Sequence, residues 1–187
     1  MSDQATGLLS PWLRRRRLVE VARHVEAPHR VLDFGCGNGE LCRYVAPADY
    51  LGVDIDAETI DEARQRNPQG RFELSVPRDT RVDRIVAAAV IEHLPDPGEW
   101  LREMGGYLLP AGRVIVTTPH PLSNWPYRLA AALRLTSRQA ADEHEQMIGL
   151  KQMSALAERA GFIVMRRRRF LFGLNQLFVL GRPSEGE

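Results

Sequence analysis

Several residue types are scarce in this chain of 187 residues, and each scarcity excludes a class of protein. Two cysteines, Cys36 and Cys42, are too few for a disulfide framework or a metal cluster. No apolar run approaches the roughly 20 residues of a membrane-spanning helix, and residues 1–17 lack an apolar stretch of signal-peptide length. A formal net charge of +1 argues against a nucleic-acid binder, which would carry a basic excess. We therefore expect a cytoplasmic protein with no transmembrane segment and no metal site.

Arginine supplies nearly all the positive charge, since Lys151 is the only lysine. Two runs of four arginines stand out, at residues 14–17 and 166–169. The first run is interpreted as a solvated helix face, with attraction of an anionic acceptor or a peripheral contact with a phospholipid surface as the alternative. The second lies in a predicted strand, where neighbouring side chains point to opposite faces. It therefore cannot form one continuous patch.

Predicted strands alternate with predicted helices over the first two thirds of the chain. The strands are expected at residues 30–34, 50–54, 71–76, 84–90 and 114–118. The helices are expected at residues 12–25, 40–45, 57–66 and 97–109, the first of them within an N-terminal helical segment of residues 1–29. This alternation predicts one α/β domain with a doubly wound, mostly parallel sheet.

The rhythm changes after residue 118. Residues 119–149 contain three prolines, Trp125 and Tyr127, and we interpret them as an inserted lid over an acceptor site, with an ordinary packing helix as the alternative. A helix at 151–160 then leads to strands at 162–170 and 176–180. The short turn between these two strands permits only antiparallel pairing.

A glycine-rich turn follows the first predicted strand. Gly35, Gly37 and Gly39 allow the backbone to turn sharply and to approach a ligand with no Cβ in the way. Asp54 ends the next strand, where a carboxylate can accept hydrogen bonds from both hydroxyls of a ribose. Together these residues predict a nucleoside pocket at the carboxyl edge of the sheet.

The charges around the turn indicate which nucleoside fits. A dinucleotide fingerprint would need a third glycine at position 40, which is Glu40, and this carboxylate would repel a pyrophosphate. Asp33 adds a second negative group beside the turn. S-adenosylmethionine, with an ammonium, a sulfonium and a ribose, suits such a site better than a diphosphate. An NAD(P)-dependent oxidoreductase is therefore the weaker alternative.

These motifs resemble those of class I methyltransferases. Residues 31–39 resemble the first motif of that family, and residues 52–56 resemble the second. Residues 90–97 and 108–113 resemble the small-molecule branch that includes ubiquinone-biosynthesis O-methyltransferases. The resemblance covers residues 30–118 and implies a Rossmann-like sheet of seven strands with an antiparallel last strand.

The resemblance also implies roles for individual residues. Asp33 would hold the methionine amino group, Asp54 would bind the ribose, and Ile55 would lie against the adenine. The implied cofactor-binding residues are Asp33, Gly35, Cys36, Gly37, Gly39, Asp54, Ile55, Ala89 and Val90. The chain departs from the family at the tip of the third strand, where an acidic residue is common near the adenine. Asp79 is the candidate substitute.

Four residues are candidates for the chemistry of transfer. Glu92 and His93 follow the fourth strand, and the imidazole of His93 could take a proton from a substrate hydroxyl or only shape the loop. His120 and His144 could face the acceptor, with a solvated surface histidine as the alternative. Alignment of the reactants supplies much of the acceleration in methyl transfer, so an essential base is not required.

The predicted function is methyl transfer from S-adenosylmethionine to a small molecule, with oxygen as the first choice of nucleophile. A non-catalytic protein that keeps the cofactor pocket is the alternative from another class. The expected partners are a small-molecule acceptor and no nucleic acid, and the chain is expected to be a monomer or a homodimer.

Overall fold

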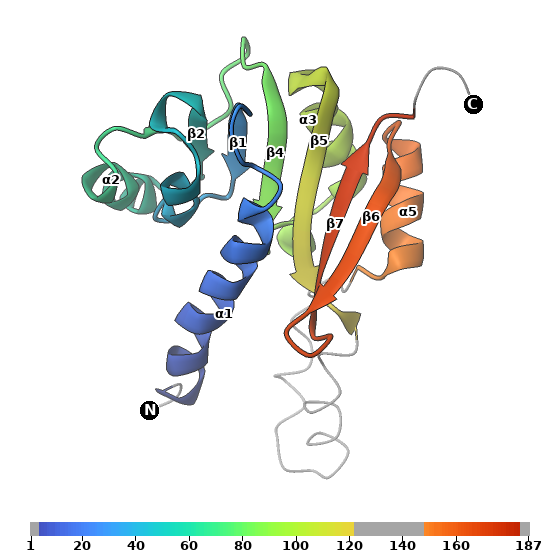
Figure 1. Cartoon of the computed structure of the whole chain (residues 1–187), viewed down its shortest axis with the longest axis horizontal. Helices are drawn as coiled ribbons and strands as arrows, with labels where there is room; N and C mark the ends of the chain where they lie inside the picture. The colour runs from blue at the N-terminus through green and yellow to red at the C-terminus, as the bar shows by residue number, and fades with distance from the viewer. Residues whose placement is uncertain (1–3, 122–147, 184–187) are drawn as a thin grey trace.

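The computed structural model describes residues 4–121 and 148–183 of the chain. A seven-stranded sheet in the order β3-β2-β1-β4-β5-β7-β6 forms its centre (Figure 1). The parallel part consists of β1 (Val31–Phe34), β2 (Tyr50–Val53), β3 (Arg71–Glu73), β4 (Val82–Ala88) and β5 (Leu108–Pro119). The predicted α/β fold with a mostly parallel sheet is confirmed.

The last two strands form the predicted antiparallel pair. β7 (Asn175–Gly181) lies between β5 and β6 (Ile163–Phe170) and runs antiparallel to both. Leu171, Phe172 and Gly173 all have positive φ angles in the turn that joins the two strands. β7 is fully buried, whereas β6 forms the edge of the sheet. The second arginine run lies on β6, and most of its side chains are exposed.

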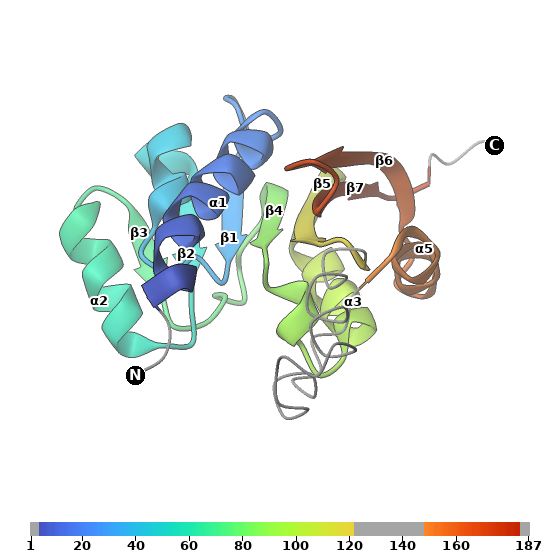
Figure 2. The same cartoon turned by 90° about the horizontal axis from the view of Figure 1, so that it is seen from below.

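Helices cover both faces of the sheet (Figure 2). One face carries α1 (Gln4–Ala22), the 3-10 helices η1 (Glu40–Tyr44) and η2 (Pro47–Asp49), and α2 (Ala57–Arg66). The other face carries the 3-10 helix η3 (Ile91–His93), α3 (Pro97–Tyr107) and α5 (Leu150–Arg159). Each face has its own apolar cluster, one containing Val21 of α1 and Ile60 of α2, the other Leu101 of α3 and Met153 of α5.

Some predicted boundaries were wrong. The helix expected at 40–45 is a five-residue 3-10 helix, because it starts from a left-handed Gly39 with no side-chain cap and runs into Pro47. The fourth strand ends at Ala88, because Ala89 has a φ of 59°. The fifth strand already starts at Leu108, and the first helix starts at Gln4 rather than at residue 12.

Most of the predicted lid, residues 122–147, lies outside the described residues. Of its ends, Pro119 closes β5 and pairs with Asn175, and Ile148 is fully buried in the core. No helix in the described parts of the chain is long and apolar enough to cross a membrane. Within the same residues, no group of three or more His, Cys, Asp or Glu side chains is placed to hold a metal ion.

Candidate functional site

The glycine-rich turn lies at the carboxyl end of β1 and adopts a conformation that side chains disfavour. Gly35, Gly37 and Gly39 have φ angles of 71°, 53° and 75°. A Cβ on Gly35 would lie 2.5 Å from Cγ2 of Val90, whereas one on Gly37 would meet no other atom within 4 Å. The turn is therefore packed against the β4 side at its start and open at its middle.

Backbone hydrogen bonds hold the turn against the tip of β2. The amides of Gly35 and Cys36 both donate to the Val53 carbonyl, at 2.8 and 3.0 Å. The Gly37 amide donates to Oδ2 of Asp54 at 3.0 Å. Asp54 therefore orients the turn while it stands at the strand tip where the sequence predicted a carboxylate.

Cys36 fills the space beneath the turn. Its side chain is buried, and its Sγ lies 2.9 Å from where a Cβ on Gly52 would stand. Burial, together with the charge of Asp33, raises the pKa of the Cys36 thiol well above its usual value. A protonated, enclosed thiol is a packing group rather than a nucleophile.

Asp33 is a buried carboxylate at the base of the turn. Tyr50 at the start of β2 donates a hydrogen bond of 2.7 Å to its Oδ2. Burial raises the pKa of the Asp33 carboxyl to about 7, the Tyr50 hydrogen bond opposes that rise, and the charge of Asp54 adds to it. A cationic group bound beside Asp33 would stabilise its ionised form.

Two cavities flank the turn and share Gly35, Ala89 and Val90 in their walls. The first, called here the helix-side cavity, has a volume of about 240 Å³. Its walls also include Arg14, Arg17, Leu18, Asp33, Cys36, Gly37, Asn38, Glu40, Leu41 and Ala88. The second, the strand-tip cavity, has a volume of about 420 Å³. Its walls also include Phe34, Val53, Asp54, Ile55, Leu74, Ser75, His93 and Leu94.

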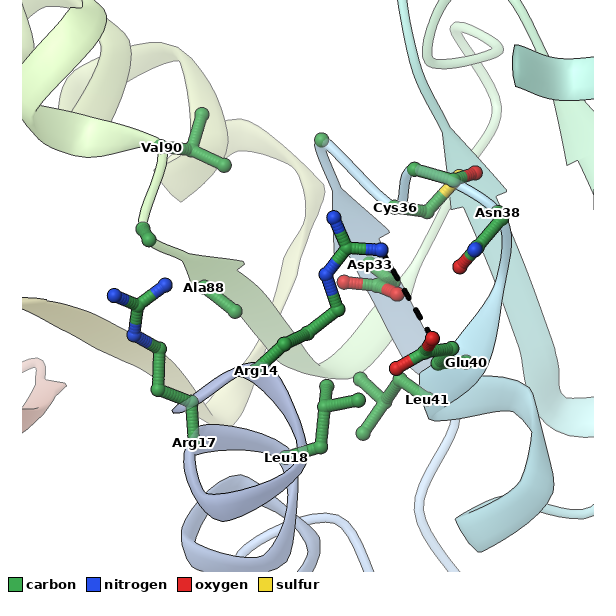
Figure 3. A pocket seen from close by; sticks show the side chains of 13 residues that line it. Arg14, Arg17, Leu18, Asp33, Cys36, Asn38, Glu40, Leu41, Ala88 and Val90 are labelled. Atoms are coloured by element: carbon green, nitrogen blue, oxygen red, sulfur yellow. Dashed lines mark hydrogen bonds and ion pairs between the residues drawn. The ribbon is translucent and has the colours of Figure 1, made fainter. Parts of the chain in front are cut away.

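The helix-side cavity contains arginines that the sequence interpretation left on a solvated face. Figure 3 shows Arg14 and Arg17 of α1 extending toward the cavity from the side opposite the turn. Arg14 lies 3.9 Å from Oε1 of Glu40, and Nε of Arg17 donates to Oδ1 of Asn175 at 3.1 Å. Arg14 and Arg17 are three residues apart, so the sequence already indicated that they share one face of a helix. Only the packing of α1 in the structure showed that this face lines the cavity.

The strand-tip cavity is open and partly apolar. The side chains of Ile55 and Leu74 are 93% and 52% exposed at the tips of β2 and β3. Asp79, the substitute suggested for an acidic adenine contact, is elsewhere: it lines a separate cavity together with Val31 and Tyr50, at the amino ends of the strands. The assignment of Asp79 was wrong because the chain after β3 returns toward the amino ends of the strands. Ser75, not Asp79, lies in the strand-tip cavity where the adenine contact was predicted.

Of the four catalytic candidates, the three that the structure describes do not line one cavity. His93 is exposed and lines the strand-tip cavity, whereas Glu92 is buried, and no residue that the structure describes is a hydrogen-bond partner for its Oε2. Burial raises the pKa of Glu92. His120 is 6% exposed at the end of β5, and burial and the nearby Arg169 and Arg167 charges lower its pKa. His144 lies outside the described residues.

Comparison with known proteins gives the class to which this fold and site belong. A family model described as a methyltransferase domain matches residues 7–166. The chain therefore belongs to the methyltransferase domain family, and within it to the S-adenosylmethionine-dependent methyltransferases.

Individual relatives carry more particular names. A probable S-adenosylmethionine-dependent methyltransferase of Mycolicibacterium smegmatis is 30% identical over 82% of this chain and 60% of its own length. A trans-aconitate 2-methyltransferase of Variovorax paradoxus is 31% identical over 64% of this chain and 51% of its own length. A ubiquinone biosynthesis O-methyltransferase of Aeromonas salmonicida is 27% identical over 72% of this chain and 63% of its own length. The chain thus spans little more than half the length of these relatives.

Among solved structures, magnesium protoporphyrin IX methyltransferase from Synechocystis with bound S-adenosylhomocysteine has the same fold. It superposes with a TM-score of 0.74 at 16% identity, over 98% of this chain and 89% of its own. At that identity the likeness concerns the arrangement of the sheet and helices.

Proposed function

We propose that this chain binds S-adenosylmethionine and transfers its methyl group to an oxygen atom of a small-molecule acceptor. The observation that carries the proposal is the glycine turn between Asp33 and Asp54, with a cavity on each side of it. Two carboxylates, one buried and one at a strand tip, match a ligand that has an ammonium group and a ribose.

The residues of the two cavities fit the parts of this cofactor. Asp33 would hold the amino group in the helix-side cavity, and the open backbone at Gly37 leaves room beside it. Asp54 would accept hydrogen bonds from the ribose. Ile55 and Leu74, both exposed in the strand-tip cavity, would be covered by the adenine. Covering exposed apolar side chains contributes about 25 cal/mol for each Å² removed from water.

The chain itself would contribute alignment and proton transfer. When bound, S-adenosylmethionine would supply the methyl group: an acceptor oxygen would form a bond to the methyl carbon while the C–S bond breaks, with the electrons of that bond remaining on sulfur as S-adenosylhomocysteine leaves. Ala89 and Val90 border both cavities and would position the reacting centre. Of the candidate bases, His93 is favoured over Glu92, His120 and His144, because His93 is the one of the four that lines either cavity among the described residues. With an acceptor whose nucleophile is a hydroxyl, His93→Gln should lower kcat without raising KM for the cofactor.

The acceptor is proposed to be a small molecule, and an anionic one is favoured. The relatives named for trans-aconitate and for ubiquinone biosynthesis methylate small molecules. Arg14 and Arg17 extend into the helix-side cavity, and two guanidinium groups there would attract a carboxylate. An acceptor that already carries an ionised oxygen needs no base, in which case the His93 variant would retain full activity.

The test is calorimetric titration with S-adenosylhomocysteine, with NADH in a parallel titration. Wild-type protein should bind the homocysteine compound in the micromolar range and not NADH. Asp54→Ala should weaken that binding about 100-fold, because two hydrogen bonds to a charged group are lost. Asp61→Ala is the matched control, since Asp61 is an exposed carboxylate on α2 outside both cavities.

The outcomes separate the alternatives. No binding of S-adenosylhomocysteine, or preference for NADH, would refute the proposal. Equal weakening by Asp54→Ala and Asp61→Ala would remove Asp54 from the site. Tight binding without turnover of any acceptor in a broad screen would favour a non-catalytic cofactor-binding protein.

A further inference from the structure

A further cavity, at the opposite end of the sheet from the glycine turn, has three arginines and two histidines in its wall. Its volume is about 320 Å³, and it is called here the amino-end cavity. Its walls are Arg23, His24, Glu26, Ala27, His29, Arg84, Arg113, Ile115 and Val179. We propose that the amino-end cavity binds the phosphate group of a phosphomonoester.

The position of this cavity separates it from the methyltransferase site. Arg84 lies near the start of β4 and pairs with Val31, the first residue of β1, whereas the glycine turn follows the last residue of β1. Arg113 is the neighbour of Arg84 on β5. Because Ala88 lies four positions after Arg84 along β4, the two sites are about 13 Å apart along the strand, and they share no lining residue.

The two central arginines are fixed in place by bonds to neutral groups. Arg84 donates from Nε to the His24 carbonyl at 3.1 Å and from Nη1 to the Asp83 carbonyl at 2.8 Å. Its Nη2 lies 2.7 Å from Nε2 of His29. Arg113 donates from Nη1 to the carbonyls of Ala111 and Gly112. These bonds orient both guanidinium groups without neutralising their charge.

Carboxylates near the cavity are engaged by other groups. Among the residues that the structure describes, neither Arg84 nor Arg113 forms an ion pair. The Asp83 carboxylate accepts from the Arg30 amide at 2.9 Å instead. Glu20 pairs with Arg23 at 3.2 Å and with Arg168 at 2.9 Å. Glu26 is the one carboxylate in the wall, and it is exposed.

The crowding of positive charge costs free energy that an anion would recover. Partial burial, followed by the charge of Arg113, lowers the pKa of Arg84 against the opposing charge of Asp83. Partial burial and the charges of Arg166, Arg84 and Arg168 lower the pKa of His24 against the opposing charge of Glu20. Cations held together and partly removed from water attract an anion more strongly than solvated ones do.

The shape of the cavity selects among anions. Three guanidinium groups and two imidazoles surround a single space, and the guanidinium N–H groups that are not engaged by the protein can donate to the oxygens of a phosphate. Ile115 and Val179 are buried and close the base of the cavity, so the organic part of a phosphomonoester would extend outward from it. Such a group could belong to a soluble metabolite or to a lipid headgroup of the phosphatidate type.

The first experiment maps binding in the wild-type protein, so that no variant has to fold. Inorganic phosphate and glycerol 3-phosphate are titrated separately into ¹⁵N-labelled protein at constant ionic strength. We expect saturable shifts at residues 23–29, at Arg84 and at Arg113. Shifts centred on residues 35–39, or shifts that do not saturate, would overturn the proposal.

The second experiment uses the double variant Arg84→Gln, Arg113→Gln and a matched control. Arg102→Gln, Arg159→Gln makes the same charge change on α3 and α5, on the other face of the sheet. The cavity variant should bind glycerol 3-phosphate at least about tenfold more weakly, and the control should bind like wild type. If both variants bind glycerol 3-phosphate equally weakly, the loss comes from net charge alone, and the proposed site is refuted. If the cavity variant does not fold, Arg113→Gln alone provides the same comparison against Arg102→Gln alone.

A third measurement distinguishes the source of the phosphate. Vesicles with and without phosphatidate are tested by co-sedimentation against the same variants. Binding of glycerol 3-phosphate without vesicle binding assigns a soluble ligand. Phosphatidate-dependent binding that is lost in the cavity variant and retained in the control assigns a lipid headgroup. If neither probe binds through the cavity, the proposal fails, and the test of S-adenosylhomocysteine binding is unaffected.

Discussion

The two ends of the sheet carry charged groups of opposite sign, and different structural features hold them in place. At the carboxyl end, the turn of residues 35–39 presents backbone amides beside Asp33 and Asp54. At the amino end, Arg84 and Arg113 present side-chain guanidinium groups, held by carbonyl oxygens. The arrangement of groups at the carboxyl end depends on backbone conformation. The arrangement at the amino end depends on which side chains are neighbours on the paired strands β4 and β5.

This difference affects how each end tolerates substitution. A turn with positive φ angles accepts few residues other than glycine, so its sequence is constrained and recognisable. A cluster of arginines contributed by the turn after α1, by β4 and by β5 leaves no motif in the sequence. The segment from Arg14 to Arg23 connects the two ends, because Arg14 lines the helix-side cavity and Arg23 lines the amino-end cavity.

The largest expected effect is that of Gly35→Ala. The new Cβ would lie 2.5 Å from Cγ2 of Val90 at a φ of 71°, so we expect a loss of about 2 to 4 kcal/mol in the free energy of unfolding and loss of cofactor binding. Denaturant unfolding measures the first, and titration with S-adenosylhomocysteine measures the second. Gly106→Ala in α3 is the control and should stabilise, since its Cβ meets no other atom within 4 Å.

A double variant separates the clash at Gly35 from the backbone strain. Val90→Ala removes the two methyl groups that the new Cβ would meet. Gly35→Ala combined with Val90→Ala should therefore recover the part of the loss that comes from the clash. If Gly35→Ala and wild type have the same free energy of unfolding, the stability of this end of the sheet does not depend on the backbone geometry at Gly35.

The next effect concerns the pH dependence of cofactor binding. An ammonium group favours ionised Asp33, so protons compete with the cofactor below the Asp33 pKa of about 7. The affinity for S-adenosylhomocysteine should then fall about 30-fold between pH 8 and pH 5.5. Titration calorimetry over this range measures it. Asp33→Asn should bind weakly with no such dependence, and a wild-type affinity that is flat with pH would contradict the role of Asp33.

A smaller effect concerns the cost of keeping Asp33 charged. Its folded-state pKa of about 7 lies above the ordinary value of 3.8, so the unfolded state binds fewer protons between these values and stability falls as pH rises through them. Asp33→Asn removes this cost. Its melting temperature should exceed that of wild type at pH 8, by about 2 to 4 °C for each kcal/mol recovered, and should match wild type near pH 4. A lower value at pH 8 would mean that the Tyr50 hydrogen bond outweighs burial.

The smallest expected effect is that of Arg14→Gln on stability. The pair between Arg14 and Glu40 spans 3.9 Å, and the two side chains are 53% and 32% exposed. Such pairs contribute little, so the free energy of unfolding should change by less than about 0.5 kcal/mol. Denaturant unfolding measures it. A larger loss would show that this pair fixes α1 against the turn.

The predictive power of the sequence differed between the parts of the molecule. The parallel strands β1 and β4 and the antiparallel pair β6 and β7 followed from hydrophobic runs and short turns. The 3-10 helix η1 was predicted as an α-helix, because local propensity does not reveal that Gly39 adopts a left-handed conformation, which sets the direction of the chain into η1. Asp79 was misplaced because a short strand leaves the direction of the following loop undetermined.

By itself the sequence determined the α/β alternation, the glycine turn and the two carboxylates beside it, because these depend on neighbouring residues and on strand periodicity. Only the tertiary structure decided which side chains from distant segments meet. It brought Arg14 and Arg17 of α1 to the helix-side cavity, and it set Arg84 and Arg113 side by side. The physical reason is that such clusters arise from the docking of a helix and the pairing of strands, and local patterns carry no information about either.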